Sequence, residues 1–125
     1  MENHPEFIDR ALEMDFEVEI DLRKIENKLY LGHDEPEYLV PLSWLEDRAA
    51  LLWVHCKNKE ALELETLHRF WHDKDDVVYT SYGILWAYPG VQPIKNSIAV
   101  LPELNDEFSN YGICTDWPIR YRDSL

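Results

Sequence analysis

The segment FEVEIDLRKIENKLYLGHD (residues 16–34) predicts two short β-strands that are joined by a polar turn. Acidic and aliphatic residues alternate along the first strand, and side chains alternate between the two faces of a strand. One face therefore carries the carboxylates, which are Glu17, Glu19 and Asp21. Neighbouring carboxylates repel one another unless solvent, a proton or a cation separates them. A solvated face is the simpler interpretation for Glu17, whereas the other two acids are candidates for a metal site.

The length and charge of the chain narrow its class. At 125 residues it is long enough for one hydrophobic core, which predicts a single domain over residues 1–125. The formal net charge is −13, so a basic patch for nucleic acid or for an anionic membrane is not expected. This charge is compatible with cation binding, although solubility is the simpler interpretation for most of the acidic residues.

The sequence predicts no membrane segment and no secretion signal. Its first residues, MENHPEF, lack the basic and apolar regions of a signal peptide, and its longest apolar run covers only residues 49–54. Cys56 and Cys114 lie in apolar, strand-like segments, which is typical of reduced thiols in a cytoplasmic protein. A disulfide between them stays an alternative on their number alone.

Helix start signals lie on both sides of the two strands. Asn3 is expected to cap a first helix that has Pro5 in its first turn. Ser43, with Glu46 three residues later, predicts the start of a second helix. Residues 49–57 then predict a buried strand.

A third helix is expected after this strand. Asn58 would cap it, and apolar residues at helical spacing would continue it to Trp71. His68 and His72 stand four residues apart near its end, a spacing that can bind a metal ion. No acidic partner pattern accompanies them, so we expect both histidines to be exposed.

The second half of the chain predicts strands that are separated by turns, at residues 77–81, 84–88, 97–101 and 112–115. Strands and helices alternate at first and strands dominate later, which favours an α/β domain with reduced helical cover. A complete (β/α)8 barrel normally needs about 250 residues, so eight full units do not fit in this chain.

Short motifs recur in a defined order. EID at residues 19–21 is followed by GHD at residues 32–34. EN at residues 2–3 precedes them, and VHCK at residues 54–57 and GICTDWP at residues 112–118 follow. In this order they resemble the PEN, ExD, GHD, E-x-K and TD-x-P motifs of the glycerophosphodiester phosphodiesterases and their phospholipase C-like relatives.

This resemblance implies a fold of the TIM-barrel type. Because the chain is short, we expect an abbreviated or partial TIM-barrel-like α/β sheet. The first strand of the family ends in an HRG motif, and the sequence contains no such motif. The resemblance therefore implies that this strand is missing, together with one histidine of the family's acid/base pair.

The resemblance also implies metal-dependent hydrolysis of a small phosphodiester, such as a glycerophosphodiester of lipid metabolism. The family uses a divalent cation to neutralise phosphoryl charge and histidines to transfer protons. Carried over by position, the implied metal ligands are Glu19, Asp21 and His55. The implied catalytic residues are His33, as general acid or base, and Lys57, which would stabilise phosphate charge. The implied substrate contacts are Asp116 and Trp117, and oxygen ligands imply Ca²⁺ or Mg²⁺.

His55 departs from the family pattern, because it stands where the third acidic ligand would be. An imidazole can bind a metal ion, but it carries less charge and suits softer metals. Two alternatives to an enzyme stay open: an inactive member of the family that keeps an ion or ligand site, and an acidic interaction module for a basic partner. An open sheet edge would also permit a homodimer.

Overall fold

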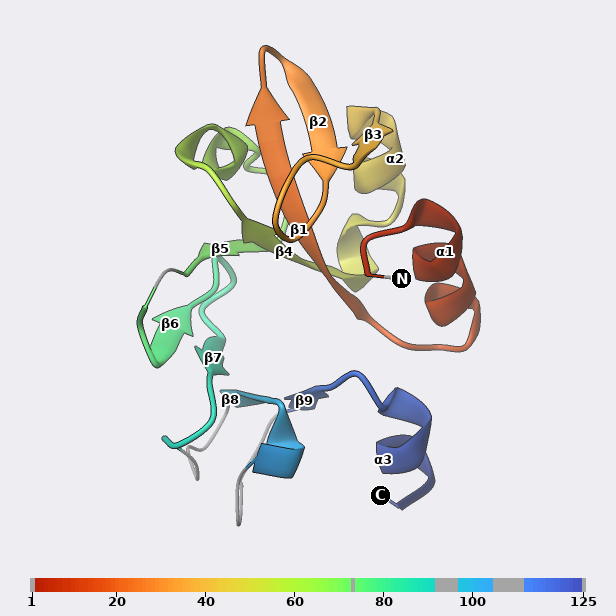
Figure 1. Ribbon diagram of the computed structural model, residues 1–125, viewed down its shortest axis with the longest axis vertical. Helices are drawn as coiled ribbons and strands as arrows, with labels where there is room; N and C mark the ends of the chain where they lie inside the picture. The colour runs from red at the N-terminus through yellow and green to blue at the C-terminus, as the bar shows by residue number, and fades with distance from the viewer. Residues whose placement is uncertain (1, 73, 92–96, 105–111, 125) are drawn as a thin grey trace. The chain divides into compact units, whose positions relative to one another are not determined.

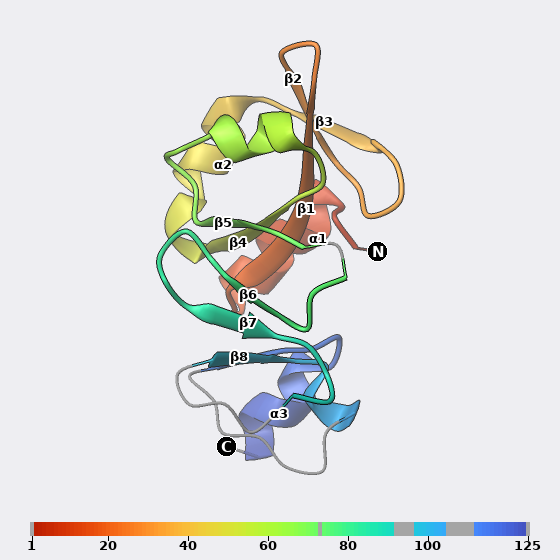
Figure 2. The same cartoon turned by 90° about the vertical axis from the view of Figure 1, so that its left-hand side faces the viewer.

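The computed structural model describes residues 2–72, 74–91, 97–104 and 112–124. Contacts between residues divide the chain into two compact units, residues 1–72 and residues 73–125. Figure 1 labels the α-helices and strands of both units, and Figure 2 shows the same structure turned by 90°.

The first unit is a five-stranded sheet with helical segments packed against it. Its elements, in chain order, are α1 (Pro5–Glu13), β1 (Val18–Ile25), β2 (Lys28–Leu31), β3 (Tyr38–Val40), α2 (Leu42–Asp47), η1 (Ala49–Leu51), β4 (Leu52–Cys56), η2 (Lys59–Glu63) and β5 (Arg69–Trp71). The strand order is β3-β2-β1-β4-β5. β4 is parallel to β1 and to β5, whereas β2 is antiparallel to β1 and to β3.

β1 and β2 form the pair of strands that residues 16–34 predict. Glu26 and Asn27 make a two-residue turn between them, and both have positive φ, 50° and 65°. Positive φ at both central residues is the turn geometry that matches the twist of a hairpin. The register of the hairpin sets Leu22 opposite Leu31.

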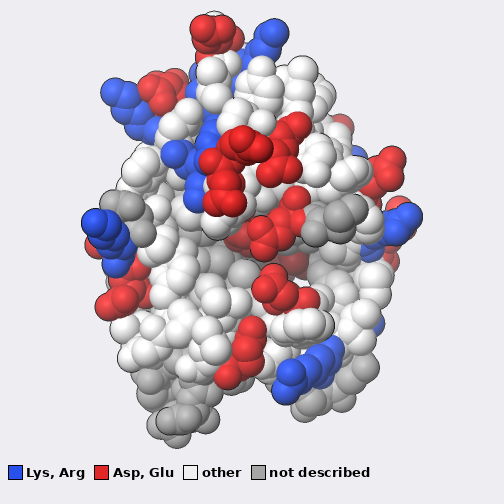
Figure 3. All heavy atoms as spheres, in the orientation of Figure 1, with Lys and Arg blue, Asp and Glu red and all other residues white. Residues whose placement is uncertain are grey.

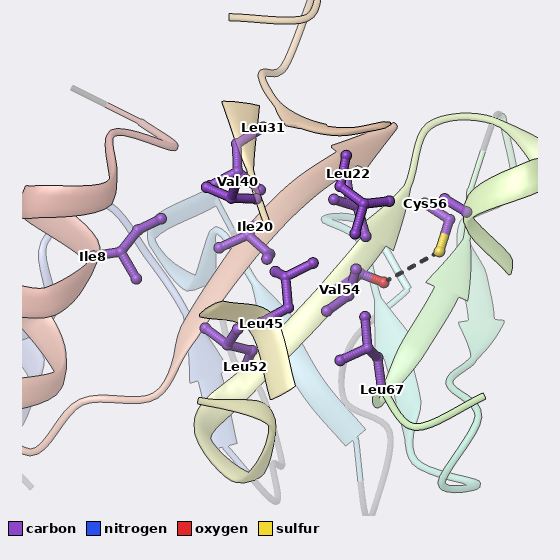
Figure 4. Packing of buried hydrophobic residues seen from close by; sticks show 12 residues of the cluster. Ile8, Ile20, Leu22, Leu31, Val40, Leu45, Leu52, Val54, Cys56 and Leu67 are labelled. Carbon is purple, nitrogen blue, oxygen red and sulfur yellow. Dashed lines mark hydrogen bonds between the residues drawn. The ribbon is translucent and has the colours of Figure 1, made fainter. Parts of the chain in front are cut away.

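The hydrophobic core of this unit lies on one face of the sheet. Ile20 of β1 and Val54 of β4 are fully buried, and Figure 4 shows Leu45 of α2 beside them. Ile8 of α1 and Leu67, which precedes β5, belong to the same cluster. Because side chains alternate along a strand, burial of the aliphatic residues on this face puts the acidic residues of β1 on the opposite face.

The prediction of a third α-helix after Asn58 is wrong. Asn58 does cap a helical segment, since its side chain accepts a hydrogen bond from the Ala61 N–H, but this 3₁₀ helix, η2, ends at Glu63. The chain then forms β5, which pairs in parallel with β4. A buried strand needs partners for its backbone groups, and the Val54 N–H donates to the His68 carbonyl at 2.9 Å. His68 is accordingly buried, not exposed.

The starts of the first two helices also differ from the prediction. His4, not Asn3, is the N-cap residue of α1, and its Nδ1 accepts a hydrogen bond from the Glu6 N–H at 3.2 Å. α2 begins at Leu42, so Ser43 lies inside the helix and is not its N-cap. Among the described residues, no side chain caps this helix. The side chain of Asn3 takes part in the candidate site instead.

The second unit holds a four-stranded sheet in the order β6-β7-β8-β9. Its elements are β6 (Val77–Tyr79), β7 (Leu85–Ala87), β8 (Ser97–Val100), η3 (Pro102–Leu104), β9 (Gly112–Cys114) and α3 (Pro118–Ser124). β6 is antiparallel to β7, whereas β8 is parallel to β7 and to β9. The four strands expected in this half of the chain are confirmed, each slightly shorter than predicted.

The TIM-barrel-like sheet implied by the resemblance is wrong. The described residues form two mixed sheets, of five and four strands, with three α-helices, and neither sheet closes into a barrel. In the first sheet β3 pairs only with β2 and β5 only with β4, so both are edge strands in the described structure. The two-residue connection from β1 to β2 allows an antiparallel neighbour, whereas a TIM barrel joins parallel strands by crossovers of a dozen or more residues.

The helices of both units are short. The longest described α-helix, α1, has nine residues. None of the described helices combines the length and the apolar character that crossing a membrane requires.

Neither cysteine forms a disulfide among the described residues, as the sequence predicts for reduced thiols. Cys56 is buried in β4, and Cys114 in β9 is partly exposed. Burial raises the pKa of the Cys56 thiol to about 12, so this group is protonated at neutral pH.

Candidate metal centre

Two parallel strands bring an acidic pair and a histidine together. β1 and β4 pair with Asp21 opposite His55, and Glu19 lies two residues before Asp21 on the same face. One ligand atom from each of the three side chains lies within 4.8 Å of the other two. The grouping of Glu19, Asp21 and His55 therefore follows from the register of two adjacent strands.

The imidazole of His55 is held in one orientation. Its Nδ1 lies 3.2 Å from Asp21 Oδ1 and 3.9 Å from Glu19 Oε1. Its Nε2 lies 3.3 Å from the main-chain carbonyl oxygen of His72, and the ring stacks on Phe70 with centroids 5.1 Å apart. Because a carbonyl only accepts hydrogen bonds, the Nε2–H donates to it, and Nδ1 faces the two carboxylates. A neutral ring in this orientation presents the lone pair of Nδ1 to them.

Asp21 is buried and hydrogen-bonded through only one of its carboxylate oxygens. Asn3 Nδ2 donates to Asp21 Oδ2 at 3.0 Å, and the Asp21 backbone N–H donates to Asn3 Oδ1 at 2.7 Å. Oδ1 of Asp21 has no hydrogen-bond partner among the described residues, although Nδ1 of His55 is 3.2 Å away. A proton on Nδ1 would make this contact an ion pair, whereas with a neutral ring that is protonated on Nε2 both atoms are acceptors and a cation could bridge them.

The two carboxyl groups differ in pKa. Burial raises the pKa of Glu19 well above the usual range of a glutamate, and the neighbouring charge of Asp21 raises it further. Burial also acts to raise the pKa of Asp21, but the contacts with His55 and Asn3 and the charge of Lys57 outweigh it, so this pKa is lowered. Two packed carboxylates resist ionising together, and a divalent cation between them would remove the conflict.

His33 lies in the loop beyond the end of β2. Its side chain is 57 % exposed, and its Nδ1 lies 2.8 Å from Asp34 Oδ1. The guanidinium of Arg23 donates hydrogen bonds to the carbonyls of Gly32 and His33, and the Gly32 N–H donates to the Asp21 carbonyl at 3.1 Å. The main chain of the GHD motif is thus anchored to the strand that carries the acidic pair, while His33 itself is outside the group of three ligand atoms.

Lys57 follows directly after β4. Its N–H donates to the Leu22 carbonyl at 2.8 Å, which extends the pairing of β1 and β4 by one residue. Burial is the largest influence on the pKa of Glu19 and of Asp21, and it acts to raise both values. The positive charge of Lys57 is a smaller influence that acts to lower both. The positive charge of Lys57 therefore acts on both acids.

Asp116 and Trp117 lie in the second unit, between β9 and α3. Both are exposed, and the Trp117 N–H donates to Thr115 Oγ1 at 3.0 Å. The structure describes them within that unit, so their proposed contact with a substrate held by the first unit stays a prediction.

Two residues of the site are not among those that the sequence predicts for it. The side chain of Asn3 holds Asp21, and its φ of 63° is a backbone conformation that Asn tolerates better than most residues. Only the EN pair of the PEN-like motif indicated this position. The main-chain carbonyl of His72 orients His55, and a main-chain contact leaves no mark in side-chain identity.

A shallow hollow between α1 and α2 is separate from this group. It is lined by Asp9, Leu12, Glu13, Asp47 and Arg48. The guanidinium of Arg48 donates to both carboxylate oxygens of Asp9, at 2.6 and 3.1 Å, so its charge is already matched. The hollow contains none of the predicted site residues.

Comparisons of the chain with protein-family models, with curated proteins and with solved structures gave no match. The function is therefore argued from the geometry of the group on β1 and β4 and from the order of the motifs.

Proposed function

We propose that this protein is a metal-dependent phosphoric diester hydrolase that acts on a small phosphodiester, such as a glycerophosphodiester. One observation carries the proposal: the ligand atoms of Glu19, Asp21 and His55 converge beside a buried carboxylate oxygen that has no hydrogen-bond partner among the described residues. Buried polar atoms are almost always paired, and a cation held beside His55 Nδ1 would give Asp21 Oδ1 a partner. The order of the motifs supports the phosphodiester as substrate class.

Glu19, Asp21 and His55 would hold the divalent cation, which, when bound, would neutralise charge on the phosphoryl oxygens. Asn3 binds Oδ2 of Asp21 and so directs Oδ1 toward the cation. The carbonyl of His72 keeps the proton of the imidazole on Nε2 and so leaves Nδ1 as the ligand atom. Both contacts orient ligand atoms before the cation arrives.

His33 would transfer a proton to or from an oxygen of the substrate. Asp34 lies 2.8 Å from its Nδ1 and orients the imidazole, so Nε2 would exchange the proton. Lys57, beside the acidic pair, would stabilise charge on the phosphate.

Calorimetry and a hydrolysis assay with glycerophosphocholine test the proposal together. Divalent-ion binding and turnover should both be lost in Glu19→Gln and in Asp21→Asn. Glu65→Gln is the matched control, because Glu65 is an exposed acid outside the group. His33→Ala should keep ion binding and lower turnover by about 10²–10⁴-fold. Ion binding that survives unchanged in both ligand variants would contradict the proposal.

Two alternatives predict other outcomes of the same experiments. Ion binding that depends on Glu19, without turnover of any phosphodiester, would favour an inactive protein that keeps its ion site. An acidic interaction module is favoured by the 25 acidic against 12 basic residues, and Figure 3 shows acidic side chains spread over the visible face. Binding of a basic partner by such a module should weaken steeply with salt and should not change in His33→Ala.

We also propose the cytoplasm as the compartment of this protein. Cys56 and Cys114 form no disulfide among the described residues, which suits a reducing environment. Expression of a tagged chain followed by fractionation would test this, and recovery with a secreted fraction would contradict it.

A further inference from the structure

The third ligand of the candidate metal centre is a nitrogen atom. Glu19 and Asp21 supply one oxygen atom each, and His55 supplies Nδ1. Nitrogen ligands move the preference of a site from Mg²⁺ and Ca²⁺ towards first-row transition metals, and three protein ligands are the usual number for catalytic zinc. We infer that this site takes a transition metal ion of the Zn²⁺ and Co²⁺ class in preference to Ca²⁺ and Mg²⁺. The inference rests on the proposed function and departs from the ions that the resemblance implies.

The contacts of His55 resemble those of histidines that bind metal ions. Its Nε2–H donates to the His72 carbonyl at 3.3 Å, and histidines that bind metals commonly donate their second N–H to such a group. The ring lies nearly parallel to that of Phe70, with 13° between the planes, and the His55 side chain is only 11 % exposed. The Nδ1 atom is thus fixed in position, facing the two carboxylates, before any ion binds.

The distances between the ligand atoms fit both a small ion such as Zn²⁺ and a larger one such as Ca²⁺. Two atoms bound to one zinc ion at about 2.0–2.2 Å lie roughly 3–3.5 Å apart, and Nδ1 of His55 is 3.2 Å from Asp21 Oδ1. Glu19 Oε1 is 3.9 Å from Nδ1, and this side chain, 27 % exposed, can close the difference by rotation. A larger ion such as Ca²⁺, with bonds of about 2.3–2.6 Å, tolerates the same spacing, so spacing alone does not select.

The number of oxygen atoms in the group favours a transition metal ion over Ca²⁺. Ca²⁺ takes about six to eight oxygen ligands, whereas the two carboxylates of the group have four oxygen atoms between them. One of these, Oδ2 of Asp21, already accepts a hydrogen bond from Asn3. Two carboxylates also supply the charge that matches one divalent ion without a third acid. The group therefore suits an ion that needs few ligands and accepts nitrogen.

Titration calorimetry at pH 7 with Zn²⁺, Co²⁺, Mg²⁺ and Ca²⁺ tests the inference on the full chain. We expect one Zn²⁺ to bind at least tenfold more tightly than Mg²⁺ or Ca²⁺. His55→Gln should lower the Zn²⁺ affinity more than tenfold and should change the visible absorption of bound Co²⁺. His55→Glu should raise the affinity for Mg²⁺ and Ca²⁺ relative to Zn²⁺. His4→Asn is the matched histidine control, because His4 lies outside the group and Asn preserves its capping role.

Each outcome separates this inference from the proposed function. Zn²⁺ that binds equally well to the wild type and to His55→Gln would be held by other histidines and would overturn the inference. Mg²⁺ or Ca²⁺ binding as tight as that of Zn²⁺ would overturn it as well. In both cases, hydrolysis that depends on a divalent ion and is lost in Glu19→Gln would leave the proposed function intact. A chain that is folded by circular dichroism and binds none of the four ions would overturn both.

Discussion

Replacement of Asn3 by glycine should destabilise the first unit by about 2–4 kcal/mol. Asn3 is 7 % exposed, and both ends of its amide are hydrogen-bonded to Asp21, at 3.0 and 2.7 Å. A hydrogen bond to a charged group contributes about 1.5–3 kcal/mol and a neutral one about 0.5–1.5 kcal/mol, and glycine leaves both partners unpaired. Glycine also adopts the φ of 63° without strain, so the loss reports the side chain.

Two further variants separate the side chain from the backbone. Asn3→Ala should cost about 1 kcal/mol more than Asn3→Gly, because a β-carbon is disfavoured at positive φ. Asn27→Gly is the matched control, since Asn27 has φ 65° in the exposed hairpin turn, and it should change stability by less than about 0.5 kcal/mol. Urea unfolding at pH 7 without metal, followed by circular dichroism and tryptophan fluorescence, measures all three differences.

The pH dependence of the Asn3→Gly effect identifies its cause. Burial acts to raise the pKa of Asp21, but the contacts with His55 and Asn3 outweigh it, and the pKa lies below the ordinary value of 3.8. Such a carboxylate stabilises the fold above its unfolded pKa, and the contribution is lost as pH falls through the folded pKa. The gap between wild type and Asn3→Gly should therefore narrow below pH 3.8. A change under about 0.5 kcal/mol at pH 7, or a gap that stays constant to about pH 3, would refute the reasoning.

Three other predictions concern single groups. Burial raises the pKa of Glu19, so ionisation of this group at neutral pH opposes folding. Without metal, Glu19→Gln should therefore raise the free energy of unfolding by about 0.5–2 kcal/mol, measured by urea unfolding at pH 7. This gain should vanish below pH 4.5, where the glutamate is protonated in both states. Gly32→Ala should lose at least about 2 kcal/mol, because its Cβ would lie 1.9 Å from the Glu35 carbonyl oxygen, whereas Gly83→Ala, with open space around its Cβ, should lose about 1 kcal/mol. Since burial raises its pKa to about 12, Cys56 should react with iodoacetamide roughly a thousandfold more slowly in the native than in the unfolded chain, as mass spectrometry would show; equal rates would contradict this.

The acidic face of β1 could be predicted because it depends on local alternation alone. Glu19 and Asp21 are two residues apart, and any strand puts such residues on one face. The β1–β2 hairpin could also be predicted from the sequence, because a short polar turn between two strands restricts them to antiparallel pairing. The position of His55 opposite Asp21 is a different matter, because it depends on a pairing of strands more than thirty residues apart, and only the order of the motifs indicated it.

The segment around β5 shows where local patterns fail. Leu67 and Phe70 are three residues apart, which fits one face of a helix. In the structure Leu67 belongs to the core, whereas Phe70 stacks on His55. The need of β4 for a pairing partner decides between the two conformations, and no window of sequence around Phe70 contains that information. The same holds for Asn3, whose role depends on Asp21, eighteen residues later.

The candidate site does not need the barrel that the resemblance implies. Its three ligands come from two neighbouring parallel strands, and the contacts that orient them come from Asn3, before α1, and from His72, just after β5. A short motif determines which side chains share a strand face, whereas closure of a barrel requires pairings between distant strands that the motif does not specify. A group of two carboxylates and a histidine can therefore form on an open five-stranded sheet, and the order of the motifs can indicate which residues lie together while mispredicting the fold around them. For this reason the function has to be tested at Glu19, Asp21 and His55, and fold-level analogy adds nothing to that test.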